Sequence, residues 1–380
     1  MKKINVAVIG LRFGSAFPPI YLEHPDVDRV AICDSNETLL QSYGDKYHID
    51  ERFARFEDIL TSGDFEAVHI LTGIPTHAEM TLAVLNAGKH CACTVPMATT
   101  IADLQSIVAA QRASKKNYMM METAVYTYHL LHVMEMLRNG EFGRIQFLRG
   151  AHYQDMEEWP PYWNGLPPMW YATHAIAPLL ALSGTRATKV HCFGSGRMRD
   201  ELVRQYGNPY PVETAIFQLS QEGLAAEVTR TLFHTAREYM ESFHVYGEKK
   251  SFEWHIENEL PVVTEMTSVD DPARPHGHKI TPERVSPLDR RDLLPEAIRH
   301  FTELHIVPDP KNPHQSLRQG GGHHGSHPHM VHEFVRSIVE EREPWSNAVT
   351  AANWTAAGIC AHESAMRGGA EVIIPSFDCI

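Results

Sequence analysis

Short apolar segments alternate with segments of helical periodicity throughout the first third of the chain. The apolar segments, which have the length of buried strands, are Ile4–Ile9, Arg29–Cys33, Ala67–Leu71, His90–Val95 and Tyr118–Met121. Helical stretches separate them, as at Ala78–Ala87 and Thr100–Ser114. Strands that alternate with helices pair in parallel through right-handed crossovers. The pattern predicts an N-terminal α/β domain on a parallel sheet, which we place at residues 1–123.

The remaining residues, 124–380, have a different pattern. A helix is predicted at Tyr128–Arg138, and a strand begins at Gly143. Residues typical of strands then recur at Val212–Leu219, Leu224–Thr231 and Ser242–Tyr246, with a hairpin turn at Gln221–Gly223. We therefore predict an α+β domain with an open, mostly antiparallel sheet.

A long excursion from this second domain is predicted at residues 259–322, which are rich in proline, histidine and charge. One short helix is expected within it, at Pro295–Leu304. Amphipathic helices follow at Met330–Arg342 and Val349–Met366. The second of these, at 349–368, is expected to pack back on the N-terminal domain.

Composition excludes several classes of protein. The 380 residues carry a net charge of −13, which argues against a surface for nucleic acid or anionic membranes. No apolar stretch approaches the about 18 residues of a membrane span, and no signal-peptide cleavage site follows the first apolar run. The six cysteines have no spacing typical of a disulfide framework or zinc site. We therefore expect reduced thiols and a cytoplasmic location.

A glycine turn follows the first strand and points to a nucleotide. In Gly10-Leu11-Arg12-Phe13-Gly14, the glycines let backbone amides approach a pyrophosphate at the start of a helix, although Arg12 replaces the usual middle glycine. Asp34 ends the second strand, 24 residues after Gly10. A carboxylate there accepts hydrogen bonds from an adenosine ribose and repels a 2′-phosphate. We predict NAD binding through Gly10, Arg12, Phe13, Gly14 and Asp34, and Arg12 leaves NADP open.

Further motifs resemble the Gfo/Idh/MocA oxidoreductases. They are Val8-Ile9-Gly10, Ile70 to His77, and Gly88-Lys89-His90 leading to Val95-Pro96. The resemblance implies a Rossmann domain followed by a domain that binds substrate and mediates assembly into a dimer or tetramer. It also implies that Thr72, Pro75, His77, Val95 and Pro96 contribute to cofactor binding. Most dehydrogenases of this family carry a proton-transferring lysine where this chain has Val95.

A narrower branch, the NAD-dependent α-N-acetylgalactosaminidases, is similar in more places. The shared segments are Val95-Pro96-Met97-Ala98, Met120-Met121-Glu122 with Tyr126, and Tyr171-Ala172-Thr173-His174 with Pro178. The resemblance implies a tightly held NAD that removes hydride from carbon 3 of a sugar. Elimination of the aglycone, addition of water and return of the hydride then give hydrolysis without net redox change.

The start of the second domain departs from that branch. His152 replaces the branch's tyrosine and Gln154 its histidine, next to Tyr153 and Asp155. Gln154 cannot transfer a proton, so the same glycoside substrate does not follow from the resemblance.

His174 is the principal acid/base candidate, because imidazole titrates near neutrality and exchanges a hydroxyl proton as hydride leaves. Tyr171, Glu122 and His152 are further catalytic candidates, and Glu122 alternatively contacts the cofactor. Tyr126, Tyr153 and Asp155 are expected to contact the substrate. The aromatic residues Trp159, Tyr162, Trp163 and Trp170 either stack on a sugar or belong to the core.

Histidines also follow three glycines in Gly320–His329. We predict that His323 and His324 contact substrate. A metal site and a solvated loop are the alternatives, and we expect no metal because Gly325 and Pro328 interrupt a helical ligand pair. Ser326 is expected to cap the following helix.

Together these features predict an NAD-dependent oxidoreductase that transfers hydride at a secondary hydroxyl of a small carbohydrate, at carbon 3. A redox-neutral glycosidase and a non-catalytic NAD-bound sugar sensor are the alternatives. The partners expected are the carbohydrate and further copies of this chain.

Overall fold

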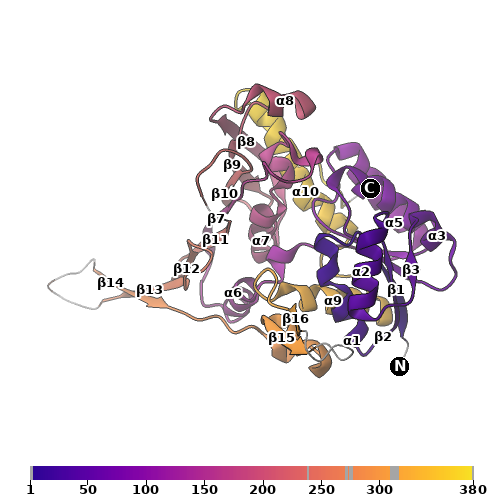
Figure 1. Cartoon of the computed structure of the whole chain (residues 1–380). Coiled ribbons are helices and arrows are strands. Elements are labelled where there is room, and N and C mark those ends of the chain that lie inside the picture. Colours follow the sequence, from indigo (N-terminus) through magenta and orange to yellow (C-terminus); the bar gives the residue numbers. More distant parts are fainter. Residues whose placement is uncertain (1–2, 238, 270–272, 274–276, 309–315, 379–380) are drawn as a thin grey trace. The chain divides into compact units, whose positions relative to one another are not determined.

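A sheet of six parallel strands, in the order β3-β2-β1-β4-β5-β6, organises the N-terminal part of the protein (Figure 1). The computed structural model describes residues 3–237, 239–269, 273, 277–308 and 316–378. The strands are β1 (Ile4–Ile9), β2 (Val27–Cys33), β3 (Arg52–Phe53), β4 (Ala67–Ile70), β5 (His90–Cys93) and β6 (Tyr118–Met120). The predicted parallel α/β domain is confirmed.

Helices connect these strands. They are α1 (Pro18–Glu23), α2 (Glu37–Tyr47), α3 (Phe56–Thr61), α4 (His77–Asn86) and α5 (Ile101–Ser114). Local capping sets some of the bounds, because the Thr100 side chain accepts a hydrogen bond from the Asp103 amide at the start of α5. The first connection differs from the prediction: after Gly10 the chain forms a 3-10 helix, η1 (Phe13–Ala16), before α1 begins at Pro18.

A second sheet has nine strands in the order β14-β13-β12-β11-β7-β10-β9-β8-β17. Its strands are β7 (Ile145–Tyr153), β8 (Ala187–Ser195), β9 (Val212–Leu219), β10 (Ala225–Thr231), β11 (Met240–Gly247), β12 (Lys250–Trp254), β13 (Val262–Ser268), β14 (His278–Arg284) and β17 (Val372–Ile373). Among the described strands of this sheet, only β10 and β7 pair in parallel, so the predicted, mostly antiparallel sheet is confirmed. Helix α7 (Thr173–Ser183) packs on β7, β10 and β11, and α8 (Asp200–Tyr206) follows β8.

The segment 259–322 is more regular than the predicted excursion. It contains the hairpin β13–β14, which extends from its sheet in Figure 1, and the two-stranded sheet β15 (His305–Pro308) and β16 (Ser316–Gln319). The helix expected at Pro295–Leu304 is the 3-10 helix η7 (Glu296–Thr302). Strong alternation is absent from the exposed β14, which explains why its strand was not predicted.

The chain divides into two compact units that interleave along the sequence. Unit 1 comprises residues 1–128, 289–352 and 377–380, and unit 2 comprises 129–288 and 353–376. Helices α6 (Tyr128–Arg138) and α10 (Ala348–Met366) contribute residues to both units. The domain boundary at residue 123 stays a prediction. No helix among the described residues is long and apolar enough to cross a membrane.

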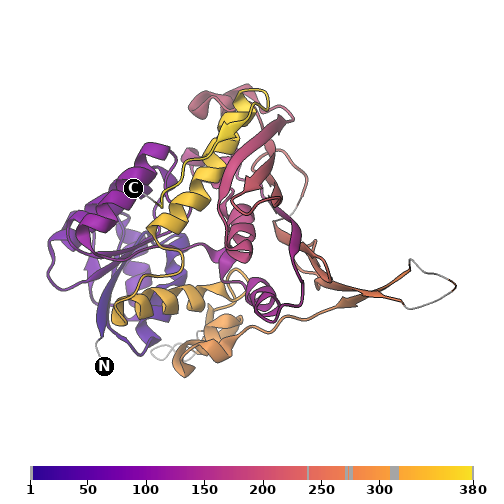
Figure 2. The same ribbon diagram turned by 180° about the vertical axis from the view of Figure 1, so that it is seen from behind.

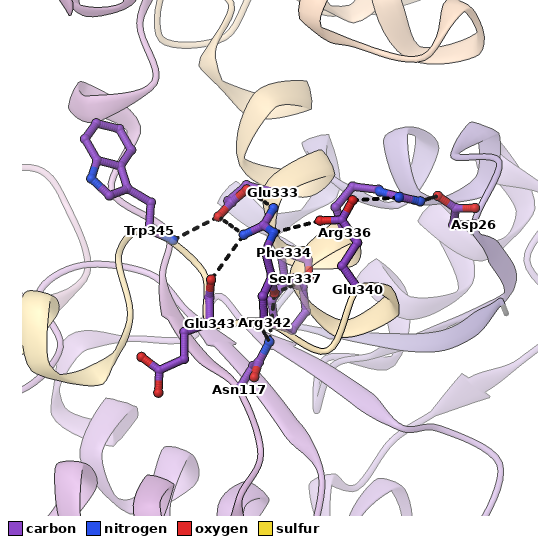
Figure 3. Close-up of polar contacts among 10 residues, drawn as sticks. All are labelled: Asp26, Asn117, Glu333, Phe334, Arg336, Ser337, Glu340, Arg342, Glu343 and Trp345. Carbon is purple, nitrogen blue, oxygen red and sulfur yellow. Dashed lines mark hydrogen bonds and ion pairs between the residues drawn. The ribbon is translucent and has the colours of Figure 1, made fainter. Parts of the chain in front are cut away.

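Polar contacts fix the return of the chain to unit 1 through α9 (Ser326–Val339), which packs on α1 and η7 (Figure 2). Arg336 donates to Asp26 at 2.8 Å, and Asn117 donates to the Ser337 hydroxyl at 2.9 Å (Figure 3). Helix α9 begins four residues earlier than predicted, and Gly325 rather than Ser326 is its N-cap. Pro328 is compatible with the first turn because its missing N–H would have no helical acceptor there.

Candidate functional site

The glycine turn of unit 1 is held against the ends of two neighbouring strands. Gly10 has φ +91°, and a Cβ on it would lie 2.7 Å from the Leu71 carbonyl oxygen, so no larger residue fits. The Asp34 carboxylate accepts hydrogen bonds from the amides of Leu11 at 2.7 Å and Asn36 at 2.8 Å. A tight turn at β1 and a carboxylate at the end of β2 fit a dinucleotide, and the ribose contact of Asp34 stays a prediction.

The structure shows packing and exposure for the other residues of the turn. A Cβ on Gly14 would lie 3.0 Å from the Leu71 side chain, so this glycine permits close packing against the end of β4. Arg12 is exposed. Phe13 is 46% exposed, and its ring lies 5.9 Å from that of Phe17. Cofactor contacts of Arg12, Phe13 and Gly14 stay predictions.

His77 links two loops at the carboxyl edge of the parallel sheet. One ring nitrogen lies 2.8 Å from the Pro96 carbonyl oxygen and the other 3.1 Å from that of Thr72. Burial lowers the pKa of His77, but Cys93 and the two carbonyl oxygens outweigh this and raise the pKa to about 9. His77 thereby joins the Thr72 loop to buried Val95-Pro96, and the cofactor contacts of these residues and of Pro75 stay predictions. Pro75 lies in the adjoining 3-10 helix η2 (Ile74–Thr76).

Glu122 follows β6 and is fully buried. Its carboxylate accepts a hydrogen bond from the Ala124 amide at 3.0 Å, which caps the 3-10 helix η3 (Thr123–Val125). Tyr126 is also buried, packs edge-on against Trp345 at 5.5 Å, and has a pKa raised by burial. Glu122 thus has a clear structural role at the strand end, and its catalytic role and the substrate contact of Tyr126 stay predictions.

The segment Gly320–His329 lies beside the glycine turn Gly10–Gly14 within unit 1. The His323 ring is 6.0 Å from Phe13, and the His327 ring is 4.6 Å from Phe17. A His324 ring nitrogen lies 3.3 Å from the Tyr128 hydroxyl. In the described part of the chain, His323 to His332 form no group of three ligands with metal spacing. Substrate contact by His323 and His324 stays a prediction.

In unit 2, three polar residues form a row across adjacent strands. Arg230 on β10 and Glu241 on β11 both stand opposite His152 on β7. Cross-strand partners share one face of a sheet. Here it is the face that α7 covers, because a Cβ on Gly150 of β7 would lie 2.3 Å from the Ala175 carbonyl oxygen. The three side chains therefore lie on the sheet face that α7 covers.

His174, the second residue of α7, lies beside this row. Its ring centroid is 5.0 Å from that of His152 and 5.4 Å from that of Tyr171. His174 is 6% exposed and His152 is fully buried. Helix α7 begins at Thr173, and Tyr171 ends the preceding 3-10 helix η5 (Pro168–Tyr171). The structure thus brings three of the catalytic candidates together.

The remaining candidates of unit 2 are less enclosed. Tyr153 is half-buried at the end of β7, while Asp155 is exposed and accepts a hydrogen bond from the Glu157 amide at 3.0 Å. Trp163 is buried against the Tyr171 ring at 4.7 Å, whereas Trp159 is 50% exposed. The substrate contacts of Tyr153 and Asp155 stay predictions.

Beside His152 lie three residues that were not predicted from the sequence, Arg230, Tyr239 and Glu241. Arg230 is fully buried, donates to the carbonyl oxygens of Tyr171 at 2.8 Å and His152 at 3.1 Å, and has a pKa that burial lowers to about 10. The Tyr239 hydroxyl donates to Glu241. The available signal was the alternation Ala226, Val228, Arg230, which puts a charge in register with apolar residues.

Comparison with known proteins identifies the class. Residues 4–122 match the Gfo/Idh/MocA family model, described as an oxidoreductase family with an NAD-binding Rossmann fold. The match covers the predicted Rossmann domain and confirms, over these residues, the resemblance to this family that the motifs predict. NAD is confirmed as the cofactor, and the chain is an enzyme of the NAD-dependent oxidoreductase type.

Individual relatives extend this likeness to most of the chain. A glycosyl hydrolase family 109 protein of Phocaeicola vulgatus is 23% identical over 345 residues, covering 85% of this chain and 70% of that protein. Another from Porphyromonas gingivalis is 27% identical over 207 residues, covering 48% and 43%.

Solved structures share the whole fold. Levoglucosan dehydrogenase, in complex with NADH and levoglucosan, superposes with a TM-score of 0.78 at 19% identity, covering 99% of this chain and 100% of that one. Aldose–aldose oxidoreductase from Caulobacter crescentus gives 0.72 at 17% identity, covering 98% and 100%. Both confirm the two-part architecture.

Proposed function

We propose that this protein oxidises a secondary hydroxyl of a small carbohydrate, at carbon 3 of a pyranose, with His174 as the acid/base. The enclosed cluster of His174, His152 and Tyr171 supports the proposal, because it brings two imidazoles and a phenol together and a neutral imidazole can accept a hydroxyl proton. Bound NAD supplies the hydride acceptor. The names of the related proteins, which include sugar dehydrogenases and glycosyl hydrolases, favour a carbohydrate as substrate.

His174 has a defined task in this reaction. As the carbon 3 hydrogen leaves as hydride, the hydroxyl proton passes to the neutral imidazole and leaves a ketone. The imidazole must be unprotonated at the start, so the oxidation rate rises with pH through the pKa of His174. Tyr171 and His152 border His174, which is 6% exposed and therefore largely shielded from water.

A redox-neutral glycosidase is the second candidate, favoured by the family 109 relatives. After oxidation at carbon 3, the ketone acidifies the carbon 2 hydrogen, whose loss as a proton expels the aglycone from carbon 1. Water then adds to carbon 1, carbon 2 regains a proton, and the hydride returns to carbon 3. A sugar sensor without turnover is the third candidate. We further propose a cytoplasmic homo-oligomer.

Two assays distinguish these candidates. The protein is denatured and any released nucleotide is identified as NAD or NADH, and the native protein is then mixed with sugars while the absorbance of NADH is followed. Free sugars that produce lasting NADH support the dehydrogenase, while aryl glycosides that release aglycone without lasting NADH support the glycosidase. His174→Gln should abolish either activity, whereas His278→Gln on exposed β14 should not. An NAD-loaded protein that binds sugars without any turnover would establish the sensor and refute catalysis.

A further inference from the structure

A carboxylate faces the two buried histidines of unit 2. Glu241 on β11 stands directly opposite His152 on β7 in the antiparallel register. His174 reaches the same face of the sheet from α7. One nitrogen or oxygen atom from each of these three side chains lies within 4.8 Å of the other two. The proposed function assigns no task to this carboxylate.

Burial makes the charge of Glu241 effective. Glu241 is 2% exposed, His152 is fully buried and His174 is 6% exposed. Water and salt screen a charge weakly in such surroundings. The Tyr239 hydroxyl donates to the Glu241 carboxylate, and the Glu241 amide donates to Glu257. The carboxylate is therefore fixed in orientation as well as position.

Arg230 supplies the opposing charge. It stands on the other side of His152, and it donates to neutral oxygens, among them those of Tyr171 and Gln154. Its guanidinium disfavours a proton on the neighbouring imidazoles, whereas Glu241 favours one. Among the described residues, the ionisable groups near the histidine pair include Arg230 from β10, Tyr171 from η5, and Tyr239 and Glu241 from β11. Glu257 lies next to Glu241, whose amide donates to it.

We propose that Glu241 is a positioning residue that enables the His152–His174 pair to accept and hold a proton. The three side chains then act as a buried His–His–Glu relay, and this role rests on the proposed function. When the hydroxyl is oxidised, its O–H bond breaks and the proton passes to His174. The hydrogen on the same carbon leaves as hydride. Glu241 keeps its negative charge and forms no covalent bond.

The pH dependence of turnover tests this role, with Glu241→Gln compared with wild type. Loss of the carboxylate charge should lower the acidic midpoint of the pH–rate profile by about one to two pH units and reduce kcat about ten- to a hundred-fold. Glu241→Asp should restore part of both. Glu227→Gln is the matched control, because Glu227 lies on β10 and pairs with Arg149. A reduced kcat with an unchanged midpoint would mean a purely structural role and overturn the inference.

Two further measurements separate this inference from the proposed function. Nitrogen NMR of the imidazoles in the NAD-loaded protein should show a lower pKa for the histidine pair in Glu241→Gln, even if no sugar is turned over. An unchanged pKa would overturn the relay. Metal analysis of the purified protein tests whether these three side chains bind a metal ion instead. One equivalent of divalent cation, lost in Glu241→Gln, would replace the relay with a metal site. If Glu241→Gln does not fold, Glu241→Met, which also removes the carboxylate and has a similar length, carries all three tests.

Discussion

Gly150 sets the distance between β7 and α7, and its substitution by alanine tests the geometry around His174. The added Cβ would lie 2.3 Å from the Ala175 carbonyl oxygen, whereas ordinary contacts begin near 3.4 Å. The start of α7 must therefore move by about 1 Å, which overpacking data put at about 1–3 kcal/mol. Reduced entropy of the unfolded chain offsets about 0.4–1 kcal/mol. We expect a net loss of about 1–2 kcal/mol.

The same displacement should affect turnover more strongly than stability. His174 precedes Ala175 in α7, and a misplacement of about 1 Å near reacting groups can reduce a rate about a hundred-fold. Urea unfolding gives the stability change, and initial rates with the active sugar give the effect on kcat. Gly63→Ala is the control, because its Cβ would meet no atom within 4 Å. A Gly150→Ala protein as stable and as active as the parent would refute the packing described here.

Three other perturbations have expected outcomes. Asp34→Ala should weaken NAD binding and remove the preference over NADP, measured by fluorescence titration. Burial lowers the pKa of His69 and His327 to about 3, whereas exposed imidazoles in the unfolded chain have a pKa of about 6.5. Because the unfolded chain therefore binds more protons in this range, the free energy of unfolding should fall as the pH decreases from about 6.5 towards 3. Urea unfolding at about pH 5 should show a loss of about 2 kcal/mol per ring, and a pH-independent midpoint would contradict this. Arg342→Met should cost about 1 kcal/mol, because its bidentate pair with Glu333 is partly exposed (Figure 3), and about 1 M salt should reduce the difference.

Helices and strands are predicted best from the sequence where residues that end an element, such as glycine, follow it directly. Strand β1 and helix α6 have the predicted bounds, since Gly10 ends the first and Asn139-Gly140 follows the second. The 3-10 helix η7 was predicted as an ordinary helix because the apolar spacing of one or two turns fits both. Residues 289–352 belong to unit 1, although they follow unit 2 residues in the chain. Hydrophobic periodicity cannot reveal this assignment, because it reports local structure and not long-range contacts.

The candidate site divides in the same way. The Gly10 turn and Asp34 follow from strand ends and spacing, and His174 follows from a motif. Arg230 and Glu241 depend on which strands are neighbours and on the register between them, and neither is encoded locally. A sequence without known pairing cannot show that the two charges flank one buried histidine.

A substrate with deuterium at carbon 3 shows whether hydride leaves from that carbon. The NAD-loaded protein is given such a pyranose or aryl pyranoside, and the rate and the position of the label in the product are measured. We expect a primary isotope effect, with deuterium recovered in NADH for a dehydrogenase. For a glycosidase, the deuterium returns to carbon 3 and solvent hydrogen enters at carbon 2. Turnover without an isotope effect and without exchange at carbon 2 would contradict hydride chemistry at this position.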